Sequence, residues 1–361
     1  MIPRYAREEM KDALARVEDL AQSSIGSLRA YGESHVWAAA VDATLAIQQA
    51  PKHLLRAQLV LLGSLAGGGP IEGPAIERFA TGVELLHLFM LVHDDVMDNA
   101  TIRRGKPALR IALQKADPTL DWQTARDTAI VVGSTLSMLA VRLMMPGRGA
   151  GAGAIAACDT MIEACFHAGA GQFQDLLGFR RLAAGEGALR RALVGKTAYH
   201  SFAAPFAAGL LLASPASDIA PALAWGEHVG VAFQATDDLM DLLTPPSETG
   251  KDALRDLLLG RPSLPLHLLR ERATGDDVSF LESVIGKHVI DIGERAALLD
   301  LMERTGVVTA CAERIRVEIA EASAIGDAAR FPAAAREGMS LFERSLLAYA
   351  SATIEAARNA T

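Results

Sequence analysis

The stretch VELLHLFMLVHDDVMD, residues 83–98, decides how this chain of 361 residues is interpreted. It contains neither Gly nor Pro, and its mostly apolar residues lead into the aspartates Asp94, Asp95 and Asp98. We predict a helix here, in which positions i and i+4 project from the same face. Asp94 and Asp98 therefore point together, and Asp95 lies beside them.

The same acidic spacing recurs in a second apolar stretch, VGVAFQATDDLMD, residues 229–241. Asp237 and Asp241 share one helix face there, with Asp238 beside it. Carboxylates on an apolar face repel one another and lose hydration when they are partly buried. Mg²⁺ relieves both costs, because it prefers oxygen ligands and is commonly shared between carboxylates and substrate phosphates. Two such triplets indicate divalent cations that hold a diphosphate, rather than an ordinary solvated acidic face.

Basic residues follow both triplets, and such residues can bind the remaining oxygens of a diphosphate through charge-assisted hydrogen bonds. They are Arg103 and Arg104 after the first triplet, Lys196 between the triplets, and Lys251 and Arg261 after the second. The Gly-Lys-Thr at 195–197 lacks the spacing and the preceding strand of a P-loop, so a nucleotide-binding loop is excluded.

The composition favours an all-α protein. Half of the residues are apolar, only 5% are aromatic, and no stretch shows sustained strand-like alternation. The length exceeds that of a typical domain, but no linker is evident. We therefore expect one all-α domain over residues 1–361, with residues 1–50 as peripheral helices outside the core.

Charge and cysteine content exclude other classes of protein. The net charge of −8 argues against nucleic acid as a partner. The three cysteines lack metal-ligand spacing and indicate core thiols in a reducing cytoplasm. Charged residues stand where a signal peptide needs an apolar run, and the longest apolar stretch, 202–213, is too short to span a bilayer. We expect a cytoplasmic protein with no integral membrane segment.

The chain resembles the trans-isoprenyl diphosphate synthases of the polyprenyl synthetase family, such as farnesyl and geranylgeranyl diphosphate synthases. The resemblance runs from about residue 51 to 265 and rests on six motifs in the family's order: LLHLFMLVHDDVMDNATIRRGKPA (85–108), GQFQDL (171–176), KTA (196–198), FQATDDLMD (233–241), GKDALRD (250–256) and GRPSLP (260–265). It implies an isoprenoid synthase helical bundle around a deep central cavity, in a homodimer. It also implies Mg²⁺-dependent head-to-tail condensation of isopentenyl diphosphate with an allylic diphosphate.

The resemblance implies metal ligands for three Mg²⁺ ions per active site. These ligands are Asp94, Asp95, Asp98, Asp175, Asp237, Asp238 and Asp241. The metals and the basic residues would stabilise the departing diphosphate, which is preorganised electrostatic catalysis. Asp256, in the fifth motif, is left between helix capping, orientation of Lys251 and metal contact.

Substrate contacts are implied in the same way. The allylic diphosphate is expected on Arg103, Lys196 and Lys251, with Gln172 nearby. Isopentenyl diphosphate is expected on Arg104 and His87, and Arg261 completes the substrate-binding set. Thr197 and Gln234 would present oxygens toward the forming carbocation, so Lys196, Thr197 and Gln234 are the catalytic residues beside the ligands Asp94, Asp98 and Asp237. Tyr199 and His200 are left between cavity lining and core packing.

One segment departs from the family's pattern. Where the family has Gly-Gly-Lys-Arg-x-Arg-Pro, this chain reads PKHLLRA over residues 51–57. Placing Arg56 on the second arginine puts His53 at the lysine position and Leu54 at the first arginine. Lys52, His53 and Arg56 are the expected contacts of isopentenyl diphosphate, with His53 a charged or a neutral ring, since its reference pKa is near 6.5. Gly133-Ser134 stands where many members have Gly-Asp, and the sequence offers no interpretation of this second difference.

Product length should depend on the side chains beneath the first acidic face. Phe89 and Met90 precede Asp94 by about one helical turn, or ~5.4 Å, so a growing prenyl tail would meet them. Both could also be ordinary core residues. As a cavity floor, a bulky Phe89 and an adaptable Met90 favour a C15 or C20 product, with C20 slightly ahead.

Two other functions fit parts of the pattern. A class I terpene cyclase would share the fold, Mg²⁺ and the first acidic motif, and it would not need the altered 51–57 segment. Arg103, Arg104 and the complete second triplet argue against it. A non-catalytic prenyl synthase subunit commonly loses one acidic motif, whereas this chain keeps both.

Overall fold

The computed structural model describes residues 8–50, 53–147, 149, 151–178, 186–243, 254–287 and 289–360. Almost all regular structure within these ranges is helical. The one sheet in this part of the chain is a two-stranded antiparallel ribbon of β1 (Ile102–Arg103) and β2 (Lys106–Pro107). The predicted all-α fold is confirmed.

The N-terminal half contains seven α-helices and two short 3₁₀ turns in the described residues. They are η1 (Glu8–Met10), α1 (Lys11–Ser27), η2 (Leu28–Tyr31), α2 (His35–Gln49), α3 (Leu55–Ala66), α4 (Pro74–Met97), α5 (Leu109–Ala116), α6 (Trp122–Met144) and α7 (Ala152–Leu177).

The C-terminal half begins with α8 (Glu186–Leu193), which continues without a break into the π-helical turn η4 (Val194–Ala203). The helices that follow are α9 (Ala204–Ala213), α10 (Ala220–Leu243), α12 (Arg255–Leu259), α13 (Leu264–Arg272), α14 (Asp276–Val284), α15 (Ile292–Arg304), α16 (Val307–Ala328) and α17 (Ala333–Ala360).

Helix α4, which carries the first acidic triplet, has a start and an end that the sequence explains. Pro74 occupies the first turn, where a missing N–H costs nothing. The helix then runs to Met97, and the C-cap residue Asp98 donates its N–H to the carbonyl of Asp94 at 2.8 Å. Asp94 and Asp98 are thus one turn apart, as the spacing predicts.

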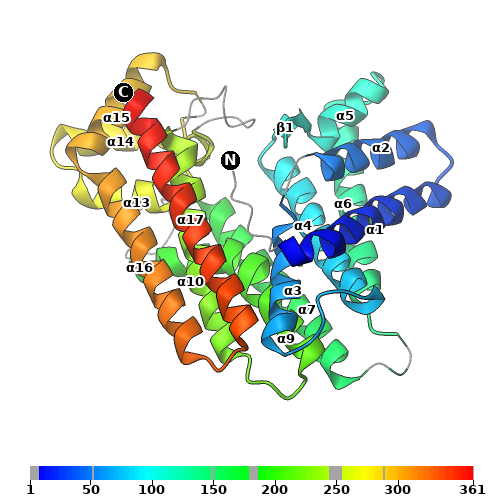
Figure 1. Ribbon diagram of the computed structural model, residues 1–361. Helices are drawn as coiled ribbons and strands as arrows, with labels where there is room; N and C mark the ends of the chain where they lie inside the picture. The colour runs from blue at the N-terminus through cyan, green and yellow to red at the C-terminus, as the bar shows by residue number, and fades with distance from the viewer. Residues whose placement is uncertain are drawn as a thin grey trace.

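Helices from both halves of the chain form the bundle. Helices α3, α4, α7, α9 and α10 lie at its centre (Figure 1). Helices α3 and α9 cross closely because glycines face each other's backbone. A Cβ on Gly63 would lie 2.0 Å from the carbonyl oxygen of Phe206, and one on Gly209 would lie 2.0 Å from that of Val60. This crossing brings the start of α3 beside η4.

An aromatic cluster anchors α17 to the bundle. The rings of Phe206 and Trp225 are 4.9 Å apart, and Phe342 of α17 lies 6.0 Å from Trp225. Trp225 is fully buried, and its indole N–H donates to Glu343 Oε1 at 2.8 Å. Buried aromatic residues contribute large apolar areas, and their polar atoms need partners. The cluster holds α9, α10 and α17 together.

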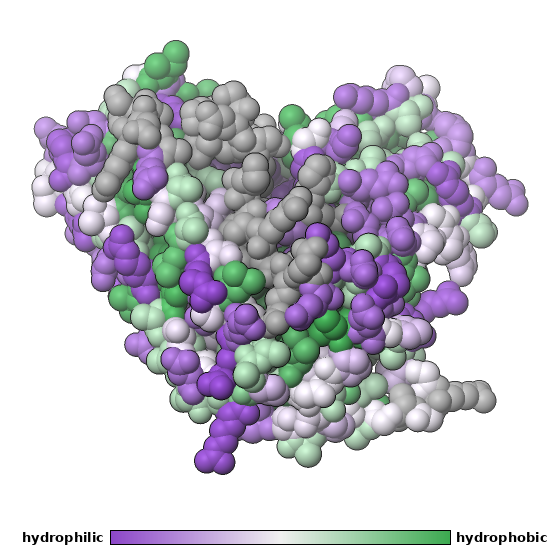
Figure 2. Space-filling view, viewed as in Figure 1, coloured by the Kyte–Doolittle hydropathy of each residue, from purple (hydrophilic) through white to green (hydrophobic). Residues whose placement is uncertain are grey.

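The N-terminal helices α1 and α2 pack on the outer side of α4 and α5. Hydrophilic side chains cover this flank in Figure 2, which also shows a notch in the upper rim between the α14–α15 side and the α2–α5 side. Helix α6 packs along α4. Of the described helices, α6 alone has the length and apolar composition to cross a membrane, and a third of its most apolar window is buried in the bundle.

Candidate active site

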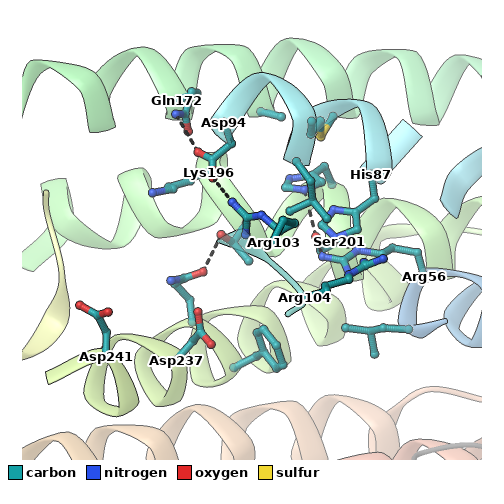
Figure 3. A pocket seen from close by; sticks show the side chains of 18 of the residues that line it. Arg56, His87, Asp94, Arg103, Arg104, Gln172, Lys196, Ser201, Asp237 and Asp241 are labelled. Carbon is teal, nitrogen blue, oxygen red and sulfur yellow. Dashed lines mark hydrogen bonds and ion pairs between the residues drawn. The ribbon is translucent and has the colours of Figure 1, made fainter. Parts of the chain in front are cut away.

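A cavity of about 1620 Å³ opens between the helices that carry the two acidic triplets. Asp94 and Asp98 line it from the end of α4, and Asp237 and Asp241 line it from α10. Figure 3 shows Asp94 on one side of the cavity and Asp237 and Asp241 on the other. The first and third aspartates of each triplet therefore reach one space from two walls.

The middle aspartates do not line the cavity. Asp95 is buried and forms an ion pair with Arg103. Asp238 accepts hydrogen bonds from Gln234 Nε2 at 2.6 Å and from the N–H of Leu264 at 3.1 Å. Burial raises the pKa of Asp238 to about 7. Neither carboxylate lies at the cavity surface, where a metal ligand was expected. Both are bound to protein groups behind the cavity wall and hold α4 and α10 to their neighbours.

Three arginines hold the first acidic wall in place. Arg103 Nη2 lies 3.2 Å from Asp94 Oδ2 and also pairs with Asp95. Arg261 pairs with Asp98, and Arg255 Nη2 lies 3.5 Å from Asp98 Oδ2. Arg103 and Arg255 line the cavity, whereas Arg261 is buried behind it, so the predicted contact of Arg261 with substrate is not matched by its position.

Lys196 lines the cavity from η4 and forms an ion pair with Asp175, Nζ to Oδ1 2.8 Å. Burial lowers the pKa of Lys196, but the carboxylates of Asp175, Asp94 and Asp256 outweigh that effect, so the net shift is upward and the ammonium stays charged. Asp175 is buried off the cavity wall, with Oδ2 3.4 Å from Arg261 Nε. It positions Lys196 and Arg261 and does not face the cavity as a metal ligand.

The placement of Lys196 depends on a tight contact between α7 and η4. A Cβ on Gly171 would lie 2.2 Å from the backbone nitrogen of Lys196, so only glycine allows this approach. Two residues later on η4, the fully buried Ala198 meets Gly230 of α10, where a Cβ would lie 2.5 Å from the Ala198 Cα. π-helical turns often occur at functional sites. Here the π-helical turn directs the side chains of Lys196 and Thr197 into the cavity.

Two amides connect the walls. Gln172 Nε2 donates to Asp94 Oδ1 at 3.3 Å, and both side chains line the cavity. Thr197 donates its hydroxyl to Gln234 Oε1 at 2.7 Å. These four side chains, from α4, α7, η4 and α10, all line the cavity.

A second polar set lies on the α3 side of the cavity. Arg56, His87, Arg104 and Glu84 line this side, and His53 lines it as well. Arg104 stands in a left-handed turn at φ 52°, followed by Gly105 at φ 71°, which turns its side chain back toward the bundle. Arg56 and Arg104 lie beside one another in Figure 3.

The cavity is apolar beyond the carboxylates. Phe89 and Met90 line it, as predicted, and the Phe89 ring meets His93 edge to face at 5.0 Å. His93 in turn needs Gly133 on α6, where a Cβ would lie 2.3 Å from the imidazole Cδ2. Gly133 thus leaves room for the His93 ring that contacts Phe89. Ser134 points to the surface.

The sequence did not reveal several lining residues, because they belong to helices without a motif. Helix α17 lines the cavity with Ser345, Ala348, Tyr349, Ala352 and Thr353.

Asp256, whose role the sequence left open, also lines the cavity. Burial and neighbouring carboxylates raise its pKa well above its usual value. Its backbone N–H donates to Asp241 Oδ2 at 3.1 Å. The predicted contacts Lys52 and Lys251 lie outside the described residues.

The donor set suits Mg²⁺. Within the described ranges, no three carboxylate, imidazole or thiol side chains are gathered into a closed metal site. Asp94, Asp98, Asp237 and Asp241 instead offer oxygens from two walls. Mg²⁺ is usually bound by one or two carboxylates together with substrate phosphates, rather than by an all-protein cage. The residues therefore fit a metal that is shared with a diphosphate.

Comparison with known proteins agrees with the fold and the site. The family model described as "Polyprenyl synthetase" matches residues 41–302. The geranylgeranyl diphosphate synthase of Mycobacterium tuberculosis is 30% identical over 282 residues, 77% of this chain and 75% of that protein. The heptaprenyl diphosphate synthase component 2 of Geobacillus stearothermophilus is 29% identical over 301 residues, 83% of this chain and 84% of that protein.

Solved structures show the same architecture. The geranylgeranyl pyrophosphate synthase of Corynebacterium glutamicum, complexed with isoprenyl diphosphate and magnesium, superposes with a TM-score of 0.82 at 20% identity. The match covers 96% of this chain and 99% of that one.

The helical fold and its cavity of carboxylates and basic residues define a prenyltransferase that uses isoprenyl diphosphate substrates. The chain belongs to the polyprenyl synthetase family, the trans-prenyl diphosphate synthases. The predicted family and enzyme class are both confirmed.

Proposed function

We propose that this protein joins isopentenyl diphosphate head to tail to an allylic diphosphate, and that its product is a C20 prenyl diphosphate in preference to C15. One observation carries the proposal. A single cavity presents two pairs of carboxylates, two separate sets of cationic side chains and an apolar end bounded by Phe89 and Met90. Each surface has a use in the reaction: the carboxylates would hold the metal ions, the two cationic sets would hold the two diphosphates, and the apolar end would hold the prenyl tail.

Asp94, Asp98, Asp237 and Asp241 are the side chains that would hold Mg²⁺. Bound Mg²⁺ neutralises diphosphate charge and so stabilises the leaving group. The ion pairs of Asp98 with Arg255 and Arg261, and of Asp94 with Arg103, fix these carboxylates in orientation.

The allylic diphosphate lies against Arg103 and Lys196, near Gln172. Both cations stay charged, because each has carboxylate neighbours that raise its pKa against the effect of burial. They favour departure of the diphosphate, since fixed positive charge stabilises the charge that develops as the allylic C–O bond breaks. The Thr197 and Gln234 oxygens face the carbon skeleton and stabilise the allylic cation.

Isopentenyl diphosphate lies against Arg56, Arg104 and His87, with His53 at the same side of the cavity. Its double bond attacks the allylic cation and forms the new C–C bond. A proton is then lost from the isopentenyl unit to the released diphosphate, so the reaction yields a prenyl diphosphate, diphosphate and H⁺. Among the described residues, the reaction needs no nucleophilic side chain.

The protein is proposed to act as a cytoplasmic homodimer, with the whole chain forming one domain. Helices α6 and α7 expose apolar side chains, many at spacings of seven residues, which is a helical stripe. The stripe consists of Val131, Met138 and Met145 near α6 and Ile155, Ile162, Phe166 and Phe173 on α7. An apolar surface of this kind is typical of a subunit interface. The three free cysteines support a reducing compartment.

The proposed reaction is tested by elongation assays with Mg²⁺, labelled isopentenyl diphosphate and dimethylallyl, geranyl or farnesyl diphosphate. Chelation by EDTA should abolish incorporation, and added Mg²⁺ should restore it. Asp237→Asn should lower kcat by about a hundredfold or more, because a metal-binding carboxylate is lost. Asp300→Asn changes an exposed carboxylate on α15 and is the matched control. Equal activity of Asp237→Asn and Asp300→Asn would contradict the proposed metal site.

A further inference from the structure

Phe89 and His93 lie one turn apart on α4 and form a pair of rings at the cavity wall. Both side chains line the cavity. Positions i and i+4 share a helix face, and here the two rings meet edge to face, with centroids 5.0 Å apart and planes at 79°. The condensation proposed above uses Phe89 as a boundary of the apolar end and does not use His93.

His93 is also fixed to the neighbouring helix α6. Its Nε2 lies 3.0 Å from the backbone carbonyl oxygen of Ile130. A carbonyl oxygen can only accept a hydrogen bond, so Nε2 carries the proton and donates it. The His93 ring therefore contacts Phe89 on its own helix and is bound to the backbone of α6.

The dipeptide Gly133-Ser134 of α6 accommodates this ring. A Cβ on Gly133 would lie 2.3 Å from His93 Cδ2 and 2.5 Å from His93 Nε2, so only glycine leaves the ring in its place. Ser134 Oγ donates to the same Ile130 carbonyl at 3.0 Å. An ionised aspartate, which many members of the family have at this position, could not donate to that carbonyl.

The His93 ring limits how far the Phe89 ring can move. An edge-to-face aromatic pair is stabilised beyond the area that it buries. The imidazole has little room to yield, because Ile130 and Gly133 hold it on the α6 side and closely packed interiors transmit strain. A prenyl tail that reaches Phe89 must therefore displace both rings or stop growing.

We propose that His93 is a positioning residue for product length, because it is held by Ile130 and Gly133 of α6 and keeps the Phe89 ring in the path of the growing tail. This inference rests on the elongation proposed above and on Phe89 as the boundary of the cavity. It adds α6 as the helix that determines how firmly that boundary is held. His93 acts through Phe89 and takes no part in breaking or forming a bond.

Elongation assays with Mg²⁺, geranyl diphosphate and labelled isopentenyl diphosphate at a fixed substrate ratio test the inference. The quantity measured is the ratio of the next longer product to the main product. His93→Ala should raise this ratio about two- to tenfold, the factor that corresponds to the loss of one aromatic contact. His93→Gln keeps an N–H donor for the Ile130 carbonyl but removes the ring, and it should raise the ratio to the same extent.

Double variants show whether the three side chains act in one line. Gly133→Ala should also raise the ratio, because its Cβ displaces the ring from the Phe89 contact. The double variant Gly133→Ala/His93→Ala should match His93→Ala alone, since Gly133 acts only through the ring. Phe89→Ala/His93→Ala should match Phe89→Ala alone, since His93 acts only through Phe89.

A second glycine at the contact between α4 and α6 provides the matched control. A Cβ on Gly82 would lie 2.5 Å from Met144 Cγ and 2.8 Å from the carbonyl oxygen of Ala140, and Gly82 does not line the cavity. Gly82→Ala should therefore lower Tm and leave the product ratio unchanged. An equal change of the ratio in Gly82→Ala and Gly133→Ala would show that general strain between the two helices is enough, and would overturn the inference.

Two further outcomes overturn the inference while the proposed function stands. One is a wild-type product ratio in both His93→Ala and His93→Gln, and these variants decide the question if Gly133→Ala fails to fold. The other is a ratio in Phe89→Ala/His93→Ala well above that of Phe89→Ala, which would make His93 a part of the boundary itself. Absence of elongation by wild type contradicts the proposed function instead.

Discussion

The hydroxyl of Thr197 donates to the side-chain carbonyl of Gln234 at 2.7 Å and so joins η4 to α10 at the cavity wall. The amide of Gln234 donates in turn to Asp238 Oδ1 at 2.6 Å, which fixes the amide orientation. The three side chains act as a chain, in which buried Asp238 orients Gln234 and Gln234 orients Thr197.

Gln234→Leu is therefore expected to lower kcat by about ten- to a hundredfold, or ~1.4–2.7 kcal/mol, with little change in either KM. Thr197→Val should have a similar effect. Because the two groups act as one unit, the double variant should cost little more than the worse single variant. Steady-state kinetics of the three variants measure the coupling, and fully additive losses would show that the hydrogen bond does not matter to the reaction.

Phe89→Ala is expected to lengthen the product by at least one five-carbon unit, because the side chain lines the cavity where a growing tail would reach it. Chromatography of the dephosphorylated alcohols gives the size. Leu88→Ala removes a neighbouring core side chain that does not line the cavity, and it should lower stability by about 2–5 kcal/mol without changing product length. An unchanged product in Phe89→Ala would remove Phe89 from the cavity floor.

The exposed stripe on α6 and α7 predicts that charge placed there separates the subunits. Met138→Glu combined with Phe166→Glu should shift the sedimentation coefficient from that of a dimer to that of a monomer. Both side chains are about two-thirds exposed in the single chain, so a monomer should tolerate the glutamates. Ile292→Glu, at an exposed position on α15, is the control and should stay dimeric. A monomeric wild type contradicts the proposed assembly.

Protein stability is expected to fall as pH drops below about 6.5, in part because of His200. The folded protein holds the pKa of His200 at about 3, whereas the unfolded chain titrates near 6.5. Between these values the unfolded state binds the extra proton, so stability is complete above pH 6.5 and decreases by about 1.4 kcal/mol per pH unit toward pH 3. The groups that face the ring are Arg56, His87 and Ser201, and the pKa of His87 is lowered as well.

Urea unfolding at pH 7.5 and pH 5.5 measures this effect. His200→Leu should lose about 1.4 kcal/mol less stability than wild type between the two pH values, because it lacks one titrating ring. The comparison with the variant removes the contribution of carboxylates that titrate in both proteins. Equal losses in wild type and His200→Leu would contradict the low pKa of His200.

The sequence predicted the helical fold, and periodicity fixed which aspartates share a helix face. That the two acidic faces meet at one cavity was implied by the resemblance alone. Asp94 and Asp98 line the cavity for that reason. The same periodicity did not distinguish the buried Asp95 and Asp238 from the aspartates that line the cavity, because burial depends on the helices packed beside them. Asp175 and Arg261 likewise carry motif positions, but tertiary contacts place them behind the wall.

The contribution of α17 and of His200 and Ser201 to the cavity wall could not be predicted from the sequence. Tyr349 and Thr353 belong to a helix with no motif, and only packing onto α10 brings them to the cavity. His200 follows Lys196-Thr197 but faces Arg56, which lies more than a hundred residues earlier in the chain. A contact at that separation depends on the α3–α9 crossing, where glycines allow close approach of the backbones.

The most direct test of the central claim is one incubation of the purified protein with Mg²⁺, labelled isopentenyl diphosphate and geranyl diphosphate, followed by dephosphorylation and sizing of the products. We predict a discrete labelled C20 alcohol. Failure to incorporate isopentenyl diphosphate, with a cyclic hydrocarbon formed from the allylic diphosphate alone, would contradict chain elongation and indicate a terpene cyclase.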